Sequence, residues 1–319
     1  MMQISNSKLK TYRRCPKKYE YKYTLKLRPK AKALPLEKGS WCHSLLQAYY
    51  EGKDWMKVHK ELTQKFLNLW EEHREELGDS LPSDCGRIMR GYLRNYPDDH
   101  DRYKVIDAEM DEVVTLPNGL RLNVIVDLIL EDTLEGGLCF WDHKFRSKLG
   151  DPDDMMLDPQ LTLYFWALEK MGYRDMRYGL YNEVRTKVPT IPKLLVRGGL
   201  SQAKNIDTDL YTYIREIRRH ELDPRDYTEI LQHIATNEET RFFRRTPIPK
   251  DPPVLRTTLR EAIDTAIEIQ RAEKQERYPR SFEPGCKWDC EFKGLCIAEL
   301  HGADISSMIK QNFEVSHRG

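Results

Sequence analysis

Two aspartates and a lysine near the middle of the sequence have the types and the spacing that metal-assisted chemistry needs. Asp127 lies in an apolar run, residues 120–130, whereas Asp142 and Lys144 lie in a second apolar run, residues 137–145. Both runs are rich in aliphatic or aromatic residues, which predicts strands, and the polar segment between them ends in two glycines, which predicts a hairpin turn. The sequence therefore predicts that one β-hairpin carries these charged side chains.

The register of this hairpin brings the side chains together. If the pairing is centred on the middle of the turn, Asp127 stands opposite Asp142, and alternation places Asp142 and Lys144 on one face and His143 on the other. Paired carboxylates suit a hard divalent cation such as Mg²⁺. A lysine beside such an ion can orient an attacking water and offset charge that develops on phosphorus. An ordinary surface ion pair between Asp142 and Lys144 remains an alternative at this stage.

Two helices carry further candidates. A helix from about residue 158 to 172 places Gln160 and Tyr164 four residues apart, so that both side chains can reach the same target. An earlier helix begins near Gly39 and carries His43 within an apolar stripe. A lone histidine in such a stripe is more often a packed core residue than a ligand, so His43 gains little weight from its own position.

The cysteines suggest a second, separate site. Cys286, Cys290 and Cys296 lie within eleven residues and could supply most of a tetrahedral thiolate site. Cys15 is the best candidate for a fourth ligand because it too lies in a Cys-Pro context between basic residues. Spacing alone leaves zinc, an iron–sulfur cluster and unrelated thiols all open. The other cysteines lie in apolar patterns and are expected to be buried: Cys42, Cys85 and Cys139.

Composition sets bounds on the partners and the compartment. The chain has 319 residues and a formal net charge of +1, but residues 8–32 are locally basic and contain interleaved tyrosines. Such a segment can grip phosphates and stack on bases, although a solvated charge run has the same composition. The amino terminus lacks the apolar core of a signal peptide and no run is long enough to span a membrane, so we expect a cytoplasmic protein with no membrane partner.

The predicted elements alternate in a way that indicates an α/β fold. Strands are expected at 104–116, 120–130, 137–145 and 177–184, and further helices at 54–77, 84–95, 208–220, 224–236 and 255–275. Glu109, in the first strand, could face the hairpin carboxylates or the solvent. The arginine- and proline-rich segment 241–253 is expected to lead into the last helix. This order predicts a mixed central sheet flanked by helices.

At this point the residues form a pattern that resembles the PD-(D/E)XK nucleases. Within that family, the chain is similar to the RecB-like branch that carries an iron–sulfur cluster. This branch includes CRISPR-associated adaptation nucleases, the AddB nuclease domain and phage exonucleases. The resemblance covers nearly the whole chain and rests on six motifs in order: Ser7-x-Leu9-x-x-Tyr12-x-x-Cys15-Pro16, Gly39-x-x-x-His43, Asp127, Asp142-His143-Lys144, Gln160-Leu161-x-x-Tyr164 and the terminal cysteines. It implies a restriction-endonuclease-like core at 101–185, after a helical and basic region at 1–100 and before a helical extension at 186–275 and a cysteine region at 276–319.

The resemblance also implies roles for individual residues. The implied ligands of a Mg²⁺ or Mn²⁺ ion are His43, Asp127, Asp142 and the backbone carbonyl of His143. Lys144 would position the nucleophilic water, while Gln160 and Tyr164 would steady the lysine and the scissile phosphate. A structural 4Fe-4S cluster would be held by Cys15, Cys286, Cys290 and Cys296.

These roles lead to one functional expectation and two alternatives. We expect a metal-dependent deoxyribonuclease, in particular an exonuclease, that acts on single-stranded or end-containing DNA with a helicase, a recombinase or a CRISPR adaptation protein as a possible partner. One alternative is a non-catalytic DNA-binding or assembly subunit that keeps the nuclease scaffold. The other is a zinc-stapled protein of unrelated function.

Overall fold

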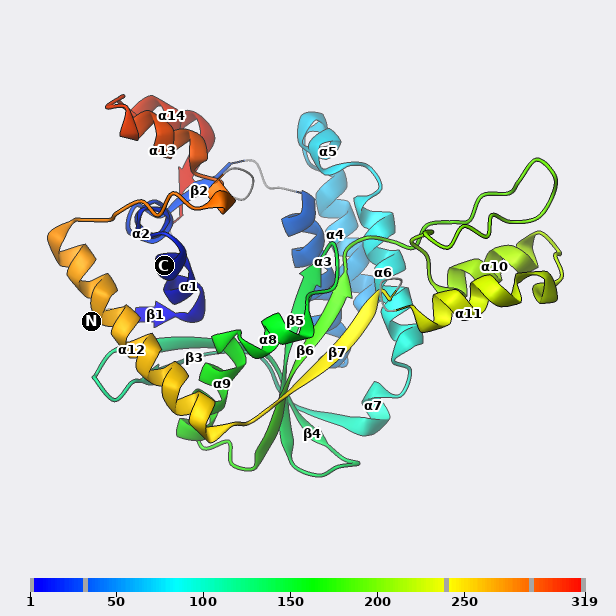
Figure 1. Ribbon diagram of the computed structural model, residues 1–319, viewed down its shortest axis with the longest axis horizontal. Coiled ribbons are helices and arrows are strands. Elements are labelled where there is room, and N and C mark those ends of the chain that lie inside the picture. Colours follow the sequence, from blue (N-terminus) through cyan, green and yellow to red (C-terminus); the bar gives the residue numbers. More distant parts are fainter. Residues whose placement is uncertain (1–2, 31–33, 238–240, 287–289, 317–319) are drawn as a thin grey trace.

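A mixed β-sheet forms the centre of the protein. The computed structural model describes residues 3–30, 34–237, 241–286 and 290–316, and within them six strands form this sheet (Figure 1). The strands are β1 (Gln3–Ser5), β3 (Tyr103–Thr115), β4 (Arg121–Asp132), β5 (Leu138–Arg146), β6 (Met176–Arg185) and β7 (Phe243–Pro249). Their order is β1-β4-β5-β6-β7, and β3 also pairs with β4. The predicted mixed sheet flanked by helices is therefore confirmed.

Strand β4 is the strand around which the others are arranged. Its partner β3 runs antiparallel along its whole length. The other edge is shared, because β1 pairs in parallel with Arg121–Asn123 and β5 pairs antiparallel with Leu128–Glu131. On this edge, residues 124–127 have no strand partner among the described residues. The sheet consequently opens beside Asp127.

Helices cover the sheet on two sides. In Figure 1, α9 and α12 lie on one side, whereas α3, α4 and α6 lie on the other. The helices of the sheet and its surroundings are α1 (Asn6–Arg14), α2 (Pro16–Tyr19), α3 (Leu34–Tyr50), α4 (Trp55–Leu67), α5 (Glu71–Leu77), α6 (Leu81–Asn95), α7 (Asp99–Arg102), α8 (Pro152–Met156), α9 (Pro159–Lys170), α10 (Leu210–Arg219), α11 (Thr228–Thr236) and α12 (Pro252–Gln275). None of the described helices combines the length and the apolar character needed to cross a bilayer.

The amino- and carboxyl-terminal segments together build a separate lobe. Strand β2 (Leu27–Pro29) pairs antiparallel with β8 (Phe313–Val315), next to α13 (Lys293–Leu300) and α14 (Ser306–Asn312). Aromatic and aliphatic side chains from both ends of the chain form its core: Tyr21, Leu27, Phe292, Leu295 and Phe313. This packing fixes the basic amino-terminal segment above the open edge of the sheet (Figure 1).

Two sequence-based predictions of helices were wrong in their extent. The predicted helix at 54–77 is two helices, since α4 ends at its C-cap Asn68 and α5 starts after Trp70. Trp70 is 80 % exposed, so its apolar character does not mark a continuous buried face. Helix α3 begins at Leu34 rather than near Gly39.

The segment 241–253 leads into the long helix α12, as predicted, but it also forms the edge strand β7, which was not predicted. Prolines disfavour central strands, but an edge strand accepts them where the missing N–H would face away from the sheet. Pro247 and Pro249 occupy such an edge. The two arginines that precede them in β7 form ion pairs with buried carboxylates: Arg244 pairs with Glu183 and Arg245 pairs with Asp99.

Asp132 closes the β4–β5 hairpin through a buried carboxylate. It accepts hydrogen bonds from the Arg102 guanidinium (2.7 and 3.2 Å), the Tyr178 hydroxyl (2.8 Å) and the backbone N–H groups of Leu134 (3.1 Å) and Glu135 (3.2 Å). Burial alone would raise the pKa of Asp132, but these donors outweigh burial and lower it to about 2. The ionised carboxylate therefore stabilises the hairpin that carries the site.

We expect Asp132→Asn to lower the free energy of unfolding by about 2 kcal/mol at pH 7. The folded-state pKa lies below the ordinary value of 3.8, so the stabilisation is complete above that value and is lost as the pH falls through about 2. Urea unfolding of both proteins at several pH values measures the difference, which should shrink in this acidic window. A difference that stays constant across the window would show that the charge of Asp132 is not the cause.

Candidate active site

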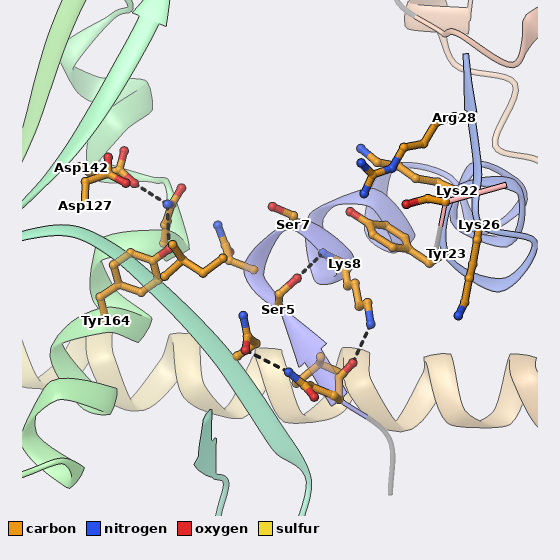
Figure 2. A pocket seen from close by; sticks show the side chains of 17 residues that line it. Ser5, Ser7, Lys8, Lys22, Tyr23, Lys26, Arg28, Asp127, Asp142 and Tyr164 are labelled. Atoms are coloured by element: carbon orange, nitrogen blue, oxygen red, sulfur yellow. Dashed lines mark hydrogen bonds between the residues drawn. The ribbon is translucent and has the colours of Figure 1, made fainter. Parts of the chain in front are cut away.

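A pocket of about 670 Å³ lies at the opening of the sheet. One wall is formed by β4, β5 and α9 through Asn123, Ile125, Asp127, Asp142, Gln160 and Tyr164. The other wall comes from the amino-terminal segment, and Figure 2 shows its basic side chains across the pocket from the two aspartates. The cations of this wall are Lys8, Lys22, Lys26 and Arg28.

The two aspartates come together through the register that the sequence predicted. The β4–β5 ladder ends with Leu128 paired to Trp141, so Asp127 and Asp142 occupy the next position, where the strands separate. The backbone N–H of His143 donates a hydrogen bond to Asp127 Oδ2 at 2.6 Å. This bond fixes the carboxylate of one strand to the backbone of the other.

Lys144 and Gln160 hold Asp142 in a compact network. Lys144 Nζ lies 2.6 Å from Asp142 Oδ2 and donates to Gln160 Oε1 at 2.9 Å. The Gln160 amide nitrogen donates to Asp142 Oδ1 at 2.5 Å and to the Tyr164 hydroxyl at 3.0 Å. Asp142 is only 4 % exposed, which excludes an ordinary surface ion pair. The Asp158 side chain caps α9 by accepting a hydrogen bond from the Gln160 backbone N–H. This start of the helix places the Gln160 side-chain amide over β5.

His43 and Glu109 reach Asp127 from the other side. His43 Nε2 lies 3.2 Å from Asp127 Oδ1, and His43 Nδ1 lies 3.5 Å from Glu109 Oε1. Potential ligand atoms of these three residues lie within 4.8 Å of one another. A Cβ atom added at Gly39, one turn before His43, would lie 3.4 Å from the Phe145 Cβ, so glycine allows α3 to approach β5 closely. His43 is therefore not a packed core residue.

Glu109 is a candidate that sequence reasoning left undecided. Its neighbours pair as Ala108 with Leu128 and Met110 with Val126, so Glu109 falls opposite Asp127. Its φ angle of +54° interrupts the regular strand at this point. Glu109 and Asp127 are equally distant along the chain from the middle of the turn at 117–119. The reasoning that placed Asp127 opposite Asp142 would therefore also have placed Glu109 at the site.

The electrostatics of the site reflect crowded, buried carboxylates. Burial, together with the charge of Asp127, raises the pKa of Asp142 despite the nearby Lys144. Burial raises the pKa of Glu109. Burial alone would lower the pKa of His43, but the hydrogen bond with Asp127 and the surrounding carboxylates outweigh it and raise the pKa. The pocket therefore favours an additional positive charge.

The His143 side chain points away from the pocket, as alternation predicted. Its ring stacks on Tyr50 with centroids 5.9 Å apart, and its Nδ1 lies 2.8 Å from the Asn182 amide nitrogen. Burial lowers the pKa of His143 to about 4, so the ring is neutral near pH 7. Only the backbone of His143 is turned toward the aspartates.

Comparison with known proteins identifies the family. The model of the PD-(D/E)XK nuclease superfamily matches residues 3–297. The chain belongs to this superfamily. Among solved structures, a protein from Eubacterium rectale described as a candidate exonuclease is 11 % identical, with a TM-score of 0.49 over 90 % of this chain and 88 % of that one. No curated protein sequence matches the chain.

This PD-(D/E)XK superfamily member has a second cavity, which is lined by cysteine side chains. Cys15, Cys286, Cys290 and Cys296 all line a cavity of about 160 Å³ in the terminal lobe. Arg280 Nε donates a hydrogen bond to Cys296 Sγ at 3.3 Å. The cavity is also lined by other basic residues, namely Arg14, Lys17, Lys18 and Lys293. The remaining cysteines are buried elsewhere, as expected: Cys42, Cys85 and Cys139.

Proposed function

We propose that this protein is a metal-dependent DNA nuclease that uses Mg²⁺ or Mn²⁺ and degrades DNA from an end. The observation that carries the proposal is the network of Asp142, Lys144 and Gln160 beside Asp127 in one pocket. Family membership supports a phosphodiester substrate. In this proposal Asp127, Asp142, Lys144, Gln160 and Tyr164 form the catalytic set.

The donor set fits a hard divalent cation. Carboxylate oxygens with one imidazole suit Mg²⁺ or Mn²⁺, and the candidate ligands are His43, Glu109, Asp127, Asp142 and the backbone carbonyl of His143. When bound, such an ion supplies a Lewis acid for a phosphoryl oxygen. The raised pKa values of Asp142 and Glu109 are consistent with a site that lacks positive charge without the ion.

The chain's own residues supply positioning. The Lys144 ammonium, held by Gln160 Oε1, orients the attacking water and offsets charge that develops on the phosphate. Burial raises the pKa of Tyr164, so its hydroxyl stays protonated. Because that hydroxyl oxygen accepts from Gln160, its hydrogen is free to be donated to a phosphate oxygen.

The basic wall supports a nucleic acid that enters between the core and the lobe. Lys8 and Lys22 both lie beside the ring of Tyr23, at 5.7 and 5.5 Å from its centroid. Partial burial lowers the pKa of each of these two lysines. Cations around a half-buried aromatic ring such as Tyr23 suit phosphates and a stacked base. A strand end would enter such a two-walled pocket more easily than a continuous duplex, which favours exonuclease action.

The test is cleavage of end-labelled linear DNA and of covalently closed circular DNA, with Mg²⁺, Mn²⁺ or a chelator. Metal-dependent loss of the linear substrate alone is expected. Cleavage of the closed circle as well would replace exonuclease by endonuclease action. DNA binding without any metal-dependent product would instead favour a non-catalytic DNA-binding subunit.

We further propose that the cysteine cavity holds a 4Fe-4S cluster, as in the RecB-like iron–sulfur branch. Cys15 comes from the amino-terminal segment and the other three cysteines come from the carboxyl-terminal region, so a shared cluster would join the two ends of the chain. Thiolate ligands carry negative charge, and the basic residues around the cavity would offset it. The cluster would be structural and would stabilise the lobe that forms the basic wall.

Replacing Cys15 by serine is expected to remove most of the iron and the visible absorbance of anaerobically purified protein. Loss of the cluster should also lower the thermal unfolding temperature of the lobe, because metal binding couples to folding. The matched control is Cys85→Ala, which removes a buried thiol outside the cavity and should leave the iron content unchanged. A colourless, iron-free wild-type protein that contains zinc would contradict the cluster.

A further inference from the structure

A second basic groove is lined by residues of α6, α10 and β7. Figure 1 shows these elements at the β7 edge of the sheet. It consists of two hollows of about 600 and 230 Å³ that share lining residues. The shared residues are Gly91, Arg94, Asp209, Tyr211, Phe242 and Phe243. None of the described residues that line this groove also lines the pocket of Asp127 and Asp142, so it is a separate surface.

Three arginines of α6 form one wall of the smaller hollow. Arg87, Arg90 and Arg94 are spaced at i, i+3 and i+7, which places them on one face of the helix. Within the described part of the chain, none of the three forms an ion pair with a carboxylate. Arg87 Nη2 donates only to the carbonyl of Pro189, at 3.4 Å, and the Arg94 guanidinium lies 3.8 Å above the ring of Tyr211.

The other cations of the groove have structural partners. Arg244 and Arg245 pair with buried carboxylates, and Arg185 forms two 2.8 Å hydrogen bonds with Asp207. These residues form ion pairs within the fold, whereas the α6 arginines have no carboxylate partner among the described residues. Asp209 is the sole acidic side chain among the described lining residues, and it is used as the N-cap of α10. The α6 arginines therefore leave a positive charge in the groove without an internal counter-charge.

We propose that this groove binds the phosphate backbone of a single DNA strand at a distance from the catalytic pocket. Along the helix axis the three arginines are about 4.5 and 6 Å apart, which suits successive phosphates of an extended strand. Tyr211 is 48 % exposed and offers a ring on which a base can stack. The choice of DNA rather than another polyanion rests on the proposed nuclease function.

The groove is close enough for one substrate to occupy both sites. Strand β7 is two strands away from β5, about 10 Å across the sheet, and a packed helix adds about another 10 Å. A strand of about ten nucleotides can span this separation. The groove would therefore retain long substrates during degradation and would contribute little for very short ones.

The test measures DNA binding by fluorescence anisotropy in the presence of a chelator, so that no cleavage occurs. Single strands of about 30 and about 6 nucleotides are titrated with wild-type protein and with the triple variant Arg87→Ala, Arg90→Ala, Arg94→Ala. We expect the affinity for the long strand to fall by about tenfold or more, and the ratio of long-strand to short-strand affinity to fall with it. The slope of log K against log salt should decrease in magnitude by about 2, as expected for three lost contacts with a single strand.

Two further variants separate charge from folding. A control that removes three exposed arginines of α12, at Arg256, Arg260 and Arg271, loses the same charge outside the groove and should keep the wild-type affinity ratio. The triple variant Arg87→Lys, Arg90→Lys, Arg94→Lys should restore most of the salt slope, because lysine keeps the charge but not the planar contact of Arg94 with Tyr211.

The outcomes also separate this proposal from the proposed nuclease function. If the triple variant binds long DNA with wild-type affinity and salt slope, the groove is not a DNA site, even if the protein cleaves DNA. The proposal would also be overturned if the triple variant kept its affinity for DNA but lost affinity for an acidic peptide. If no protein preparation cleaves DNA but the affinity ratio still falls in the variant, the groove is supported while the nuclease proposal fails.

Discussion

Replacing Asp142 by asparagine is expected to reduce metal-dependent DNA cleavage by about 10³-fold or more while the fold is retained. Asparagine has nearly the same shape as aspartate, but it lacks the negative charge that a divalent cation needs. It also replaces by an amide the carboxylate that contacts Lys144 and Gln160. Burial raises the pKa of Asp142, so the ionised carboxylate is unfavourable for folding in the absence of metal. The thermal unfolding temperature of the metal-free variant should therefore be equal to or higher than that of the wild type.

Cleavage by a folded Asp142→Asn protein at the wild-type rate would place the active centre elsewhere. The matched control is Asp175→Asn, which removes a 64 % exposed carboxylate from the segment before β6 and should alter neither rate nor stability. Isothermal titration with Mn²⁺ gives a second readout, since metal affinity should fall in the Asp142 variant and not in the control.

Local pattern was sufficient to predict the hairpin that carries the aspartates. The runs around Asp127 and Asp142 are rich in aliphatic or aromatic residues, which predicts strands, and the two-glycine turn between them indicates their register. The family pattern added His43, whose own helix gave no such signal, because the contact with Asp127 depends on how closely α3 packs on β5. That packing distance is a tertiary property that helical periodicity does not contain.

Two other features were beyond the sequence for different physical reasons. Strand β1 is three residues long, and its place beside β4 is determined by long-range pairing rather than by local propensity. Strand β7 contains Arg244 and Arg245, which look like solvated charges in a sequence. Their partners, Glu183 and Asp99, lie far away along the chain, so only the folded structure shows that these arginines are internal.

Replacing Arg245 by methionine is expected to lower the free energy of unfolding by about 3–5 kcal/mol, because it leaves a buried aspartate without its counter-charge. Asp99 is 5 % exposed, and both of its oxygens accept from Arg245, one at 2.8 Å and the other at 2.5 Å. The guanidinium also donates to the Tyr92 hydroxyl at 2.9 Å and lies 3.5 Å above the ring of Tyr96. Chemical denaturation of the variant measures the loss.

The double variant Arg245→Met, Asp99→Asn tests whether charge is the cause. Since asparagine removes the orphaned charge, the double variant should lose less stability than the sum of the two single variants, with a coupling energy of about 2 kcal/mol. Strict additivity would mean that Arg245 acts through its contacts with Tyr92 and Tyr96 and not through its charge pair with Asp99.

Arg245 is also connected to the active site by a chain of buried hydrogen bonds. Tyr92, which accepts from Arg245, also accepts from the Asn182 amide at 2.7 Å. Asn182 in turn contacts His143, whose backbone N–H holds Asp127. Loss of Arg245 should therefore weaken Mn²⁺ binding measured well below the unfolding temperature, in addition to lowering stability.

A second arginine–aspartate pair provides the control for this functional effect. Arg185 makes a comparable bidentate contact with Asp207 but is not part of the hydrogen-bond chain that leads to His143. Arg185→Met should therefore lower stability while leaving the Mn²⁺ affinity of the folded protein unchanged. Equal losses of Mn²⁺ affinity in the two variants would mean that the effect follows general destabilisation and not the path from Arg245 to Asp127.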